Sequence, residues 1–247
     1  LQDMIRSLEK RGYEIEDFPH HWQVQLNDTH PAIAVAELMR LLVDERHLEW
    51  EQAWEIVTKS VAYTNHTLLP EALEKWDLKL FKTLLPRHME IIYEINRRFL
   101  QVVRLHYPGD DTMLEKMSII DERGSKSVRM AHLATVGSHH INGVAALHSE
   151  LVKTQLMPEF YDLWPHKFTN VTNGVTPRRW IASCNPSLAD VFTEYAGEDW
   201  ATNMDSLKIL EKNQDDRQLL QKLGEAKLIG KHNLATYIFD NLGISVD

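Results

Sequence analysis

The sequence has only one cysteine, Cys184, in 247 residues, so no disulfide can form within the chain. Its longest apolar stretches are far shorter than the roughly 18 residues that a membrane-spanning helix needs, and no secretory signal pattern is visible. Lys and Arg, 27 in all, are fewer than the 36 Asp and Glu, which gives a net charge of -9. This charge disfavours nucleic acid and anionic membranes as partners. We therefore expect an intracellular protein without a membrane segment, acting on a neutral ligand.

Several catalytic motifs are also missing. The sequence has no Gly-x-Ser-x-Gly elbow, no Walker loop and no Gly-x-Gly-x-x-Gly, which leaves serine-nucleophile chemistry and mononucleotide binding without support. The chain begins at Leu1, and Asp3 to Leu8 already reads as the middle of a helix. We expect a fragment of a longer protein.

The hydrophobic pattern predicts a helix-rich α/β fold. Strands are expected at 22–26, Val61–Thr64, 117–120 and 127–131, and helices at 32–46, 51–60 and Pro86–His106. Pro70 is expected to open a further helix with Glu71 and Glu74 in its first turns, and Ser138 to cap one running through Val144, Leu147 and Leu151. From Pro177 onward the pattern is almost wholly helical, at 178–196, 203–212, 214–229 and 231–241. We place a domain boundary between 1–176 and 177–247.

Three loops share one pattern, in which an apolar, strand-like run leads into polar residues and then a proline. They end at Pro31, Pro70 and Pro177 and carry Asn27-Asp28-Thr29-His30, Asn65-His66-Thr67 and Asn170 to Thr176. Ligands of open α/β sheets bind beyond the carboxyl ends of the strands. The loops are therefore the first candidate for a site.

Each of these candidates also has an interpretation without a ligand. Asp28 could orient the His30 imidazole or bind sugar hydroxyls, but Asp28 or Thr29 could equally cap a helix. His66 alone resembles an ordinary loop histidine, and its recurrence in the context of His30 favours a shared pocket. Asn173 offers both a donor and an acceptor to a sugar hydroxyl, although Asn173-Gly174 is also a strong turn signal.

His132, His139, His140 and His148 form the densest histidine segment. Neither a zinc motif nor a His pair at helical spacing accompanies them, so we predict no metal site. Arg178 and Arg179 suggest phosphate binding, but such arginines are more often solvated or ion-paired.

The three loops, together with Leu84 to His88, Ile91 to Asn96, Met130 to Leu133 and Pro165 to Phe168, resemble the α-glucan phosphorylase family, which includes glycogen, starch and maltodextrin phosphorylases. The resemblance covers about Val24 to Asn185. It implies part of a GT-B, Rossmann-like glycosyltransferase fold in which a C-terminal domain, absent here, binds pyridoxal 5′-phosphate. It also implies a cytoplasmic or plastid homodimer that uses inorganic phosphate to release glucose 1-phosphate, with retention, from the nonreducing ends of α-1,4-glucan.

The resemblance also implies roles for individual residues. His66 and Asn173 would bind the 6-hydroxyl of the glucose, and the His66 carbonyl would lie near the developing oxocarbenium charge. Asp28, His30, Thr67 and His148 would line the same pocket. A glucan storage site of animal members would fall on Tyr93, Asn96, Glu122 and Lys126, although Glu90 and Arg97 replace glutamines of that pattern.

Three hypotheses follow from these observations. The first is that the chain supplies the glucose-binding wall of a phosphorylase and is inactive alone. The second is a stand-alone oligosaccharide-binding module, and the third a histidine-based metal hydrolase.

Overall fold

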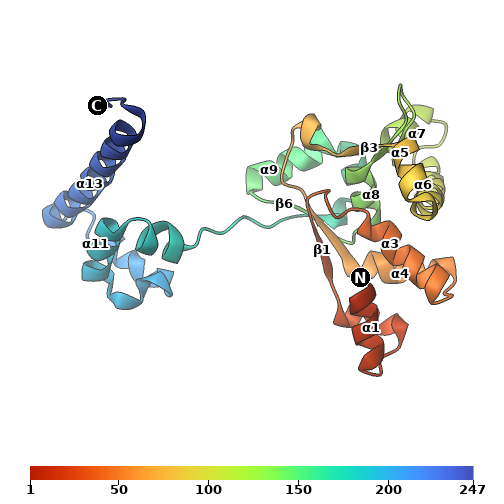
Figure 1. Cartoon of the computed structure of the whole chain (residues 1–247), viewed down its shortest axis with the longest axis horizontal. Coiled ribbons are helices and arrows are strands. Elements are labelled where there is room, and N and C mark those ends of the chain that lie inside the picture. Colours follow the sequence, from red (N-terminus) through yellow and green to blue (C-terminus); the bar gives the residue numbers. More distant parts are fainter. Residues whose placement is uncertain (247) are drawn as a thin grey trace. The chain divides into compact units, whose positions relative to one another are not determined.

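The computed structural model describes residues 1–246. The chain divides after Asn173 into two compact units, Leu1–Asn173 and a second that begins at Gly174 (Figure 1). The first unit is an α/β domain that contains both sheets, and the second is helical. No helix within residues 1–246 is long and apolar enough to cross a membrane.

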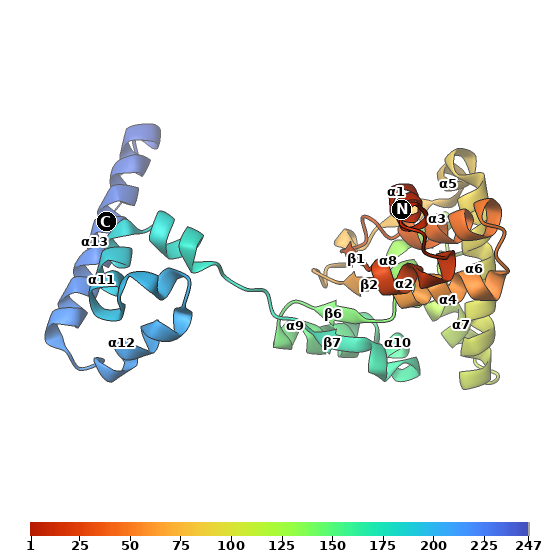
Figure 2. The ribbon, with the colours of Figure 1, turned by 90° about the horizontal axis from the view of Figure 1, so that it is seen from below.

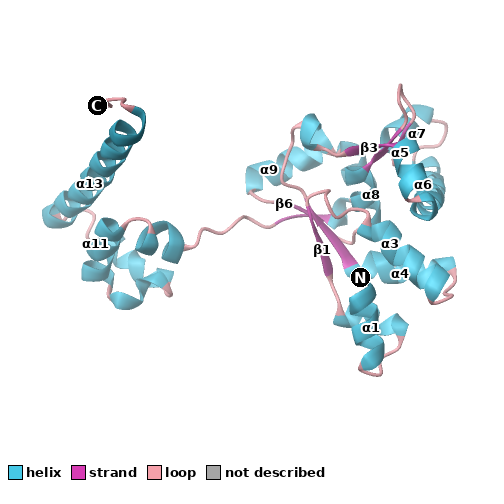
Figure 3. Cartoon of the chain, in the orientation of Figure 1, coloured by secondary structure: helices cyan, strands magenta, loops and turns pink. Residues whose placement is uncertain are grey.

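A four-stranded parallel sheet lies at the centre of the first unit (Figure 3). Its strands run in the order β1 (Val24–Asn27), β2 (Val61–Thr64), β6 (Ile141–Gly143) and β7 (Phe168–Asn170). Val24 pairs with Val61, Tyr63 with Ile141, and Ile141 with Phe168. Val61 and Tyr63 are fully buried, as expected of a parallel strand with both faces covered. Because all four strands are parallel, their carboxyl ends lie on one edge.

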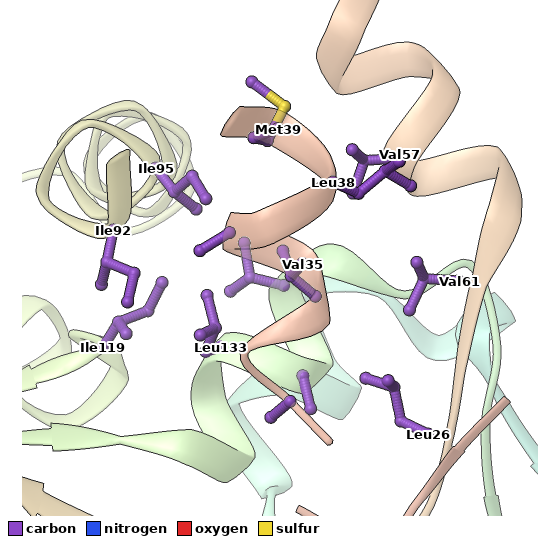
Figure 4. Close-up of a cluster of buried hydrophobic side chains, with 14 of the residues drawn as sticks. Leu26, Val35, Leu38, Met39, Val57, Val61, Ile92, Ile95, Ile119 and Leu133 are labelled. Atoms are coloured by element: carbon purple, nitrogen blue, oxygen red, sulfur yellow. The ribbon is translucent and has the colours of Figure 1, made fainter. Parts of the chain in front are cut away.

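Helices pack around this sheet and supply most of the core (Figure 2). The α-helices of this unit are α1 (Gln2–Lys10), α2 (Phe18–His21), α3 (Ala34–Arg40), α4 (Trp50–Ser60), α5 (Leu78–Leu84), α6 (Pro86–His106), α7 (Asp111–Met117), α8 (Met130–Gly137), α9 (Ala146–Leu151) and α10 (Pro158–Leu163). Figure 4 shows α3 between α4 and α6, with Leu38 of α3 beside Val57 of α4, and with Ile92 of α6 on the opposite side. A π-helical segment extends α3 (Leu41–Glu45) and another extends α9 (Val152–Leu156).

A second, antiparallel sheet consists of β3 (Lys75–Asp77), β5 (Ser127–Arg129) and β4 (Ile120–Asp121), in that order. A buried ion pair joins two of its strands, with Arg129 Nη2 at 3.0 Å from Asp121 Oδ1. The other terminal nitrogen of Arg129 donates to the carbonyl oxygens of Glu115, Lys116 and Ser118. This satisfied guanidinium fastens the C-terminal end of α7 to the sheet.

The second unit contains a π-helical segment (Arg178–Ser183), α11 (Pro186–Ala196), two 3₁₀ segments (Glu198–Ala201 and Met204–Lys208), α12 (Ile209–Lys212) and α13 (Arg217–Leu242). Its small core includes Val191, Trp200 and Leu219. The indole N–H of Trp200 donates to Thr193 Oγ1 over 2.9 Å. Asn185 and Asp216 cap α11 and α13 by accepting backbone N–H groups, as short polar side chains do at helix starts.

The α/β class, the helix Pro86–His106 and the strand Val61–Thr64 are confirmed. The predicted helix at Pro70 is wrong. A 3₁₀ turn (Pro70–Ala72) is followed there by β3, and α5 begins only at Leu78, where Asp77 Oδ1 caps the Leu80 N–H. The exposed segment 75–77 is extended because β5 provides its hydrogen-bond partners.

Other predicted elements are present in the structure with different bounds. Ser138 ends α8 instead of capping a helix, and β6 follows it at Ile141. The helix expected through Leu147 and Leu151 is present as α9, which begins only at Ala146. The predicted strand 127–131 ends earlier, at Arg129, and α8 begins at Met130. The predicted strand 117–120 contributes only Ile120, since Met117 ends α7. The helices expected at 214–229 and 231–241 form the single helix α13.

Candidate functional site

The loops after β1, β2 and β7 all leave the sheet at its carboxyl edge. A ladder of polar side chains crosses the strands just before them. Gln25 Nε2 donates to Thr64 Oγ1 over 2.8 Å, and Thr64 Oγ1 donates to Asn142 Oδ1 over 2.8 Å. This ladder holds three neighbouring strand ends in register. Sequence reasoning missed it, and the one signal available was a polar residue near the end of each strand.

The loop after β1 turns at Asp28, which has a positive φ of 64°. Aspartate tolerates this left-handed conformation better than most residues. The Asp28 backbone N–H donates to the Thr64 carbonyl over 3.0 Å, and its carboxylate accepts the Thr29 N–H over 2.7 Å. The carboxylate is therefore held at the end of β1, beside β2.

His30 contacts a different carboxylate, that of Glu74. Its Nδ1 is 3.4 Å from Glu74 Oε1, and its ring lines a small, mainly apolar cavity of about 110 Å³ with Trp76 and Leu80. The hydroxyl of Thr29 is buried and donates to Glu74 Oε2 over 2.7 Å. The structure therefore pairs the imidazole with Glu74, and not with Asp28 as one interpretation of the sequence suggested.

His66 extends from the end of β2 toward β1. Its Nε2 lies 2.6 Å from Asn27 Oδ1, so the Nε2–H donates to the amide oxygen and a neutral ring keeps Nδ1 as an acceptor. The ring is exposed. Thr67 is engaged locally, because its Oγ1 accepts the Leu69 N–H over 3.1 Å.

Asn65 anchors the same loop from inside. It is fully buried, its backbone N–H donates to the Asn142 carbonyl over 2.9 Å, and its side-chain N–H donates to the Tyr63 hydroxyl over 3.1 Å. Burial raises the pKa of Tyr63, and the charge of Asp28 raises it further, so the phenol stays protonated. Asn65 Oδ1 is buried without a hydrogen-bond partner among residues 1–246, which leaves one acceptor unused beside this network.

His148 joins α9 to the loop after β2. Its Nε2 donates to the carbonyl of Asn65 over 3.0 Å. The helix reaches that position because residue 143 has no side chain. A Cβ built on Gly143 would lie 2.5 Å from Ser149 Oγ and 2.8 Å from His148 Cδ2. The close approach of α9 to β6 therefore depends on this glycine.

The loop after β7 is tied to the same region. Ser149 Oγ donates to Asn170 Oδ1 over 2.7 Å, and the backbone N–H of Asn173 donates to the Val144 carbonyl over 3.0 Å. The structure thus brings Asp28, His66, His148 and Asn173 to one edge of the sheet. The polar groups there are mostly neutral hydrogen-bond donors and acceptors, which suits a polyhydroxylated ligand better than an ion.

The remaining histidines of the dense segment are separated. His132 is half-buried beside the Met117 and Ser118 carbonyls, which lie 3.2 and 3.0 Å from its Nδ1. Burial lowers the pKa of His132 to about 4. His139 and His140 contact each other ahead of β6, with their Nδ1 atoms 2.6 Å apart. Within residues 1–246, no three His, Cys, Asp or Glu side chains converge to hold a metal ion.

The four residues of the expected storage site have different surroundings. Tyr93 is exposed, and Lys126 forms an ion pair with Glu122 over 2.9 Å. Asn96 is buried, its Nδ2 donates to Ser118 Oγ over 3.1 Å, and its Oδ1 accepts the Ile119 N–H over 2.8 Å. The Asn96 amide is therefore occupied within the fold, and a glucan could contact it only by displacing these bonds.

Comparison with known proteins covers the whole chain. The family model for carbohydrate phosphorylase matches residues 1–247, beyond the range in which the sequence motifs were recognised. The chain is 56% identical to glycogen phosphorylase of Synechocystis over 247 residues, which is its full length. It is 48% and 46% identical to the muscle forms from Ovis aries and Homo sapiens, each over 96% of the chain. The chain spans 29% of the length of each of these relatives. The chain belongs to the carbohydrate phosphorylase family.

Proposed function

We propose that this chain supplies the glucose-binding wall of an α-1,4-glucan phosphorylase, which releases glucose 1-phosphate from nonreducing ends with retention of configuration. Residues 1–176 would form the later part of the glucan-binding domain, and 177–247 a helical segment leading to a C-terminal cofactor domain. The observation that carries this proposal is the convergence of the loops after β1, β2 and β7 in a chain of this family. Alone, the chain would be inactive.

Within this wall we assign the 6-hydroxyl of the terminal glucose to His66 and Asn173. His66 has a defined tautomer because Asn27 accepts its Nε2–H, which leaves Nδ1 to accept a hydroxyl proton. The His66 carbonyl would stabilise positive charge developing at the anomeric carbon, as fixed dipoles do when they are placed in advance.

The other predicted residues would act around these two. Asp28 and Thr67 would line the pocket, His30 would lie at its flank beside Glu74, and His148 would position the loop through the Asn65 carbonyl. Tyr93, Asn96, Glu122 and Lys126 remain a proposed surface site for glucan. Of these, Asn96 would contribute through the fold and not by direct contact.

Pyridoxal phosphate, the cofactor of this family, does not fit the residues at the carboxyl edge. A Schiff base needs a lysine amine, and the edge loops of this chain present Asp28, Asn65, His66 and Asn173. Arg178 and Arg179 belong to the second unit. We place the cofactor in the part of the longer protein outside this chain. The homodimer and the cytoplasmic or plastid location remain predictions.

The test uses the longer enzyme carrying this segment. His66→Ala and Asn173→Ala should each lower kcat/KM for glucose 1-phosphate, in the direction of glucan synthesis, by roughly 10–100-fold, the effect of losing about 1.5–3 kcal/mol of hydrogen bonding. His232→Ala, an exposed histidine on α13, serves as the control.

A 6-deoxy substrate makes the test specific. The wild type should turn it over poorly. In the two variants, removing the 6-hydroxyl should lower kcat/KM little further, because each variant has already lost the partner of that hydroxyl. Equal discrimination against the 6-deoxy substrate by wild type and both variants would refute the assignment. An intact enzyme that forms no glucose 1-phosphate from maltodextrin and phosphate would refute the proposed function.

A further inference from the structure

A cavity in the first unit lies between the antiparallel sheet and the helices α7, α8 and α10. It has a volume of about 330 Å³, within the range of roughly 300–1,000 Å³ that is usual for pockets binding small molecules. Four cationic side chains line it, Lys75 of β3, Lys116 of α7, Arg123 of the turn between β4 and β5, and Arg129 of β5. We call this cavity the basic pocket.

Three of these cations share one carboxylate, that of Asp121. Its Oδ1 lies 3.0 Å from Arg129 Nη2 and 3.2 Å from Arg123 Nε, and its Oδ2 lies 3.1 Å from Lys75 Nζ. The Asp121 side chain is only 8% exposed, so it is fixed in place beneath the pocket. One negative charge against three positive charges leaves a local excess of positive charge, in a chain whose net charge is -9.

Two of the cations keep unused hydrogen-bond donors. Asp121 accepts one N–H of Lys75 and the Nε–H of Arg123. Among residues 1–246, no hydrogen bond uses the terminal nitrogens of Arg123 or the other ammonium protons of Lys75. The Arg123 and Lys75 side chains are 68% and 51% exposed. They can therefore turn toward a ligand, and the planar fork of a guanidinium matches the oxygens of a phosphate group.

The two acids that line the pocket already have partners. Glu74 Oε2 accepts the Thr29 hydroxyl over 2.7 Å, and Glu74 Oε1 lies 3.4 Å from His30 Nδ1. Glu159 Oε1 lies 3.3 Å from Lys116 Nζ. Even with Asp121 included, three acids face four permanent cations. The balance of charge favours an anion over a cation or a neutral ligand.

Apolar side chains complete the lining. Leu73, Ala131, Leu156 and Phe160 contribute carbon surface, and Phe160 is 2% exposed. The volume of about 330 Å³ is several times the roughly 30 Å³ that a water molecule occupies in the liquid. A free inorganic anion would therefore leave much of the cavity unfilled, whereas a ligand that joins an anionic group to an apolar body would contact both parts of the lining.

We propose that the basic pocket binds a small organic phosphate, with its phosphate group held by Lys75, Lys116 and Arg123 and its organic part resting on Leu73 and Phe160. A phosphate monoester carries about -1.5 to -2 charges at pH 7, and its oxygens accept paired hydrogen bonds from a guanidinium. Arg129 acts through its charge, because Asp121 and three backbone carbonyls already occupy its terminal nitrogens.

The basic pocket is separate from the proposed glucose wall. Glu74 is the lining residue that reaches the loop after β1, through Thr29 and His30. Neither His66 nor Asn173 lines the pocket. The proposal therefore holds whether or not the carboxyl edge binds glucose.

The test measures binding of phenyl phosphate to the chain by calorimetry at pH 7.5 and low salt. Saturable binding is expected, with a Kd of about 1 mM. Inorganic phosphate should bind about tenfold more weakly because it has no apolar body, and neutral benzyl alcohol should not bind measurably. Added salt should weaken the binding of phenyl phosphate, since Lys75 and Arg123 are exposed to solvent.

Arg123→Gln and Lys75→Met should each weaken the binding of phenyl phosphate about tenfold, the effect of losing one charge-assisted hydrogen bond. Arg104→Gln and Lys79→Met are the matched controls, because they remove the same charges from exposed positions outside the pocket. Both controls should bind like the wild type, as should His66→Ala. Thermal unfolding checks that each variant is folded, and Arg123→Gln decides the question if Lys75→Met disturbs β3.

Several results would overturn the proposal. These are no saturable binding to the wild type, unchanged binding in both pocket variants, or an equal loss in the two controls, which would indicate attraction to charge anywhere on the surface. Inorganic phosphate that binds as tightly as phenyl phosphate would overturn the assignment to an organic phosphate. None of these measurements depends on glucan turnover, so failure here and failure of the proposed function are distinguishable.

Discussion

Gly143→Ala should destabilise the first unit by preventing α9 from packing on β6. The added Cβ would meet Ser149 Oγ at 2.5 Å, His148 Cδ2 at 2.8 Å and Ser149 Cα at 2.8 Å. The two side chains could rotate away, but a backbone atom cannot. The helix itself must therefore shift. A shift would stretch the bond from His148 to the Asn65 carbonyl, now 3.0 Å, and the bond from Ser149 to Asn170, now 2.7 Å.

The expected loss of unfolding free energy combines the steric overlap, the two weakened hydrogen bonds and a change in the unfolded chain. Overpacking costs about 1–3 kcal/mol, and each weakened hydrogen bond costs about 1 kcal/mol. Alanine also lowers the conformational entropy of the unfolded chain, which stabilises the folded state by about 0.4–1 kcal/mol. We expect a net loss of about 2–4 kcal/mol of unfolding free energy, which for a unit of this size lowers the melting temperature by roughly 5–15 °C.

Thermal and urea unfolding, followed by circular dichroism and tryptophan fluorescence, measure this loss. Gly174→Ala is the control, because a Cβ there meets nothing within 4 Å and the backbone is not left-handed. It should unfold within about 1 °C of the wild type, since a glycine at an unstrained, open position gains at most a little from the substitution. If Gly143→Ala also unfolds within that margin, the contact between α9 and β6 does not constrain the site.

Three further predictions concern buried polar groups. The pKa of His132 is lowered to about 4 in the folded state, so the unfolded chain binds more protons than the folded chain between about pH 6.5 and 4. About 2–3 kcal/mol of unfolding free energy, fully present above pH 6.5, should be lost as the pH falls through this window. In urea titrations at pH 7 and 4.5, His132→Gln should lose less unfolding free energy between the two pH values than the wild type. Asp121→Ala leaves the buried Arg129 charge uncompensated and should cost about 3–5 kcal/mol in urea unfolding, whereas a cost under 1 kcal/mol would contradict the pairing. Asn96→Ala should cost about 1–3 kcal/mol because it leaves the Ile119 N–H without its acceptor, while Tyr93→Ala, at an exposed position, should leave the melting temperature nearly unchanged.

Much of the fold could be predicted because local rules determined it. The helix Pro86–His106 has a regular apolar face and a proline at its first residue, and both signals lie within the helix itself. The strand Val61–Thr64 is a short, mainly apolar run, which is typical of a strand in a parallel sheet covered on both faces. The positions of the polar loops followed from the same signals.

The remaining elements depend on partners far away in the sequence. Segment Lys75–Asp77 is exposed at every residue and becomes a strand only because β5 pairs with it. Strand β6 is three residues long and ends in glycine, too short for an alternating pattern to be recognised. In the site, His148 and Asn65 are 83 residues apart, so their contact depends on strand order and could not be deduced from spacing.

The strand order also determines when the site can form during folding. Thr64 and Asn142, which join β2 to β6, are 78 residues apart, and a long loop must close before their pairing gains any energy. Contacts of such high sequence separation form slowly. The helices and the hairpin of the second sheet can form earlier from nearby residues. The carboxyl edge of the sheet, the proposed glucose wall, would then be among the last parts of the first unit to assemble, and recovery of the proposed ligand affinity during refolding would report the closure of the parallel sheet.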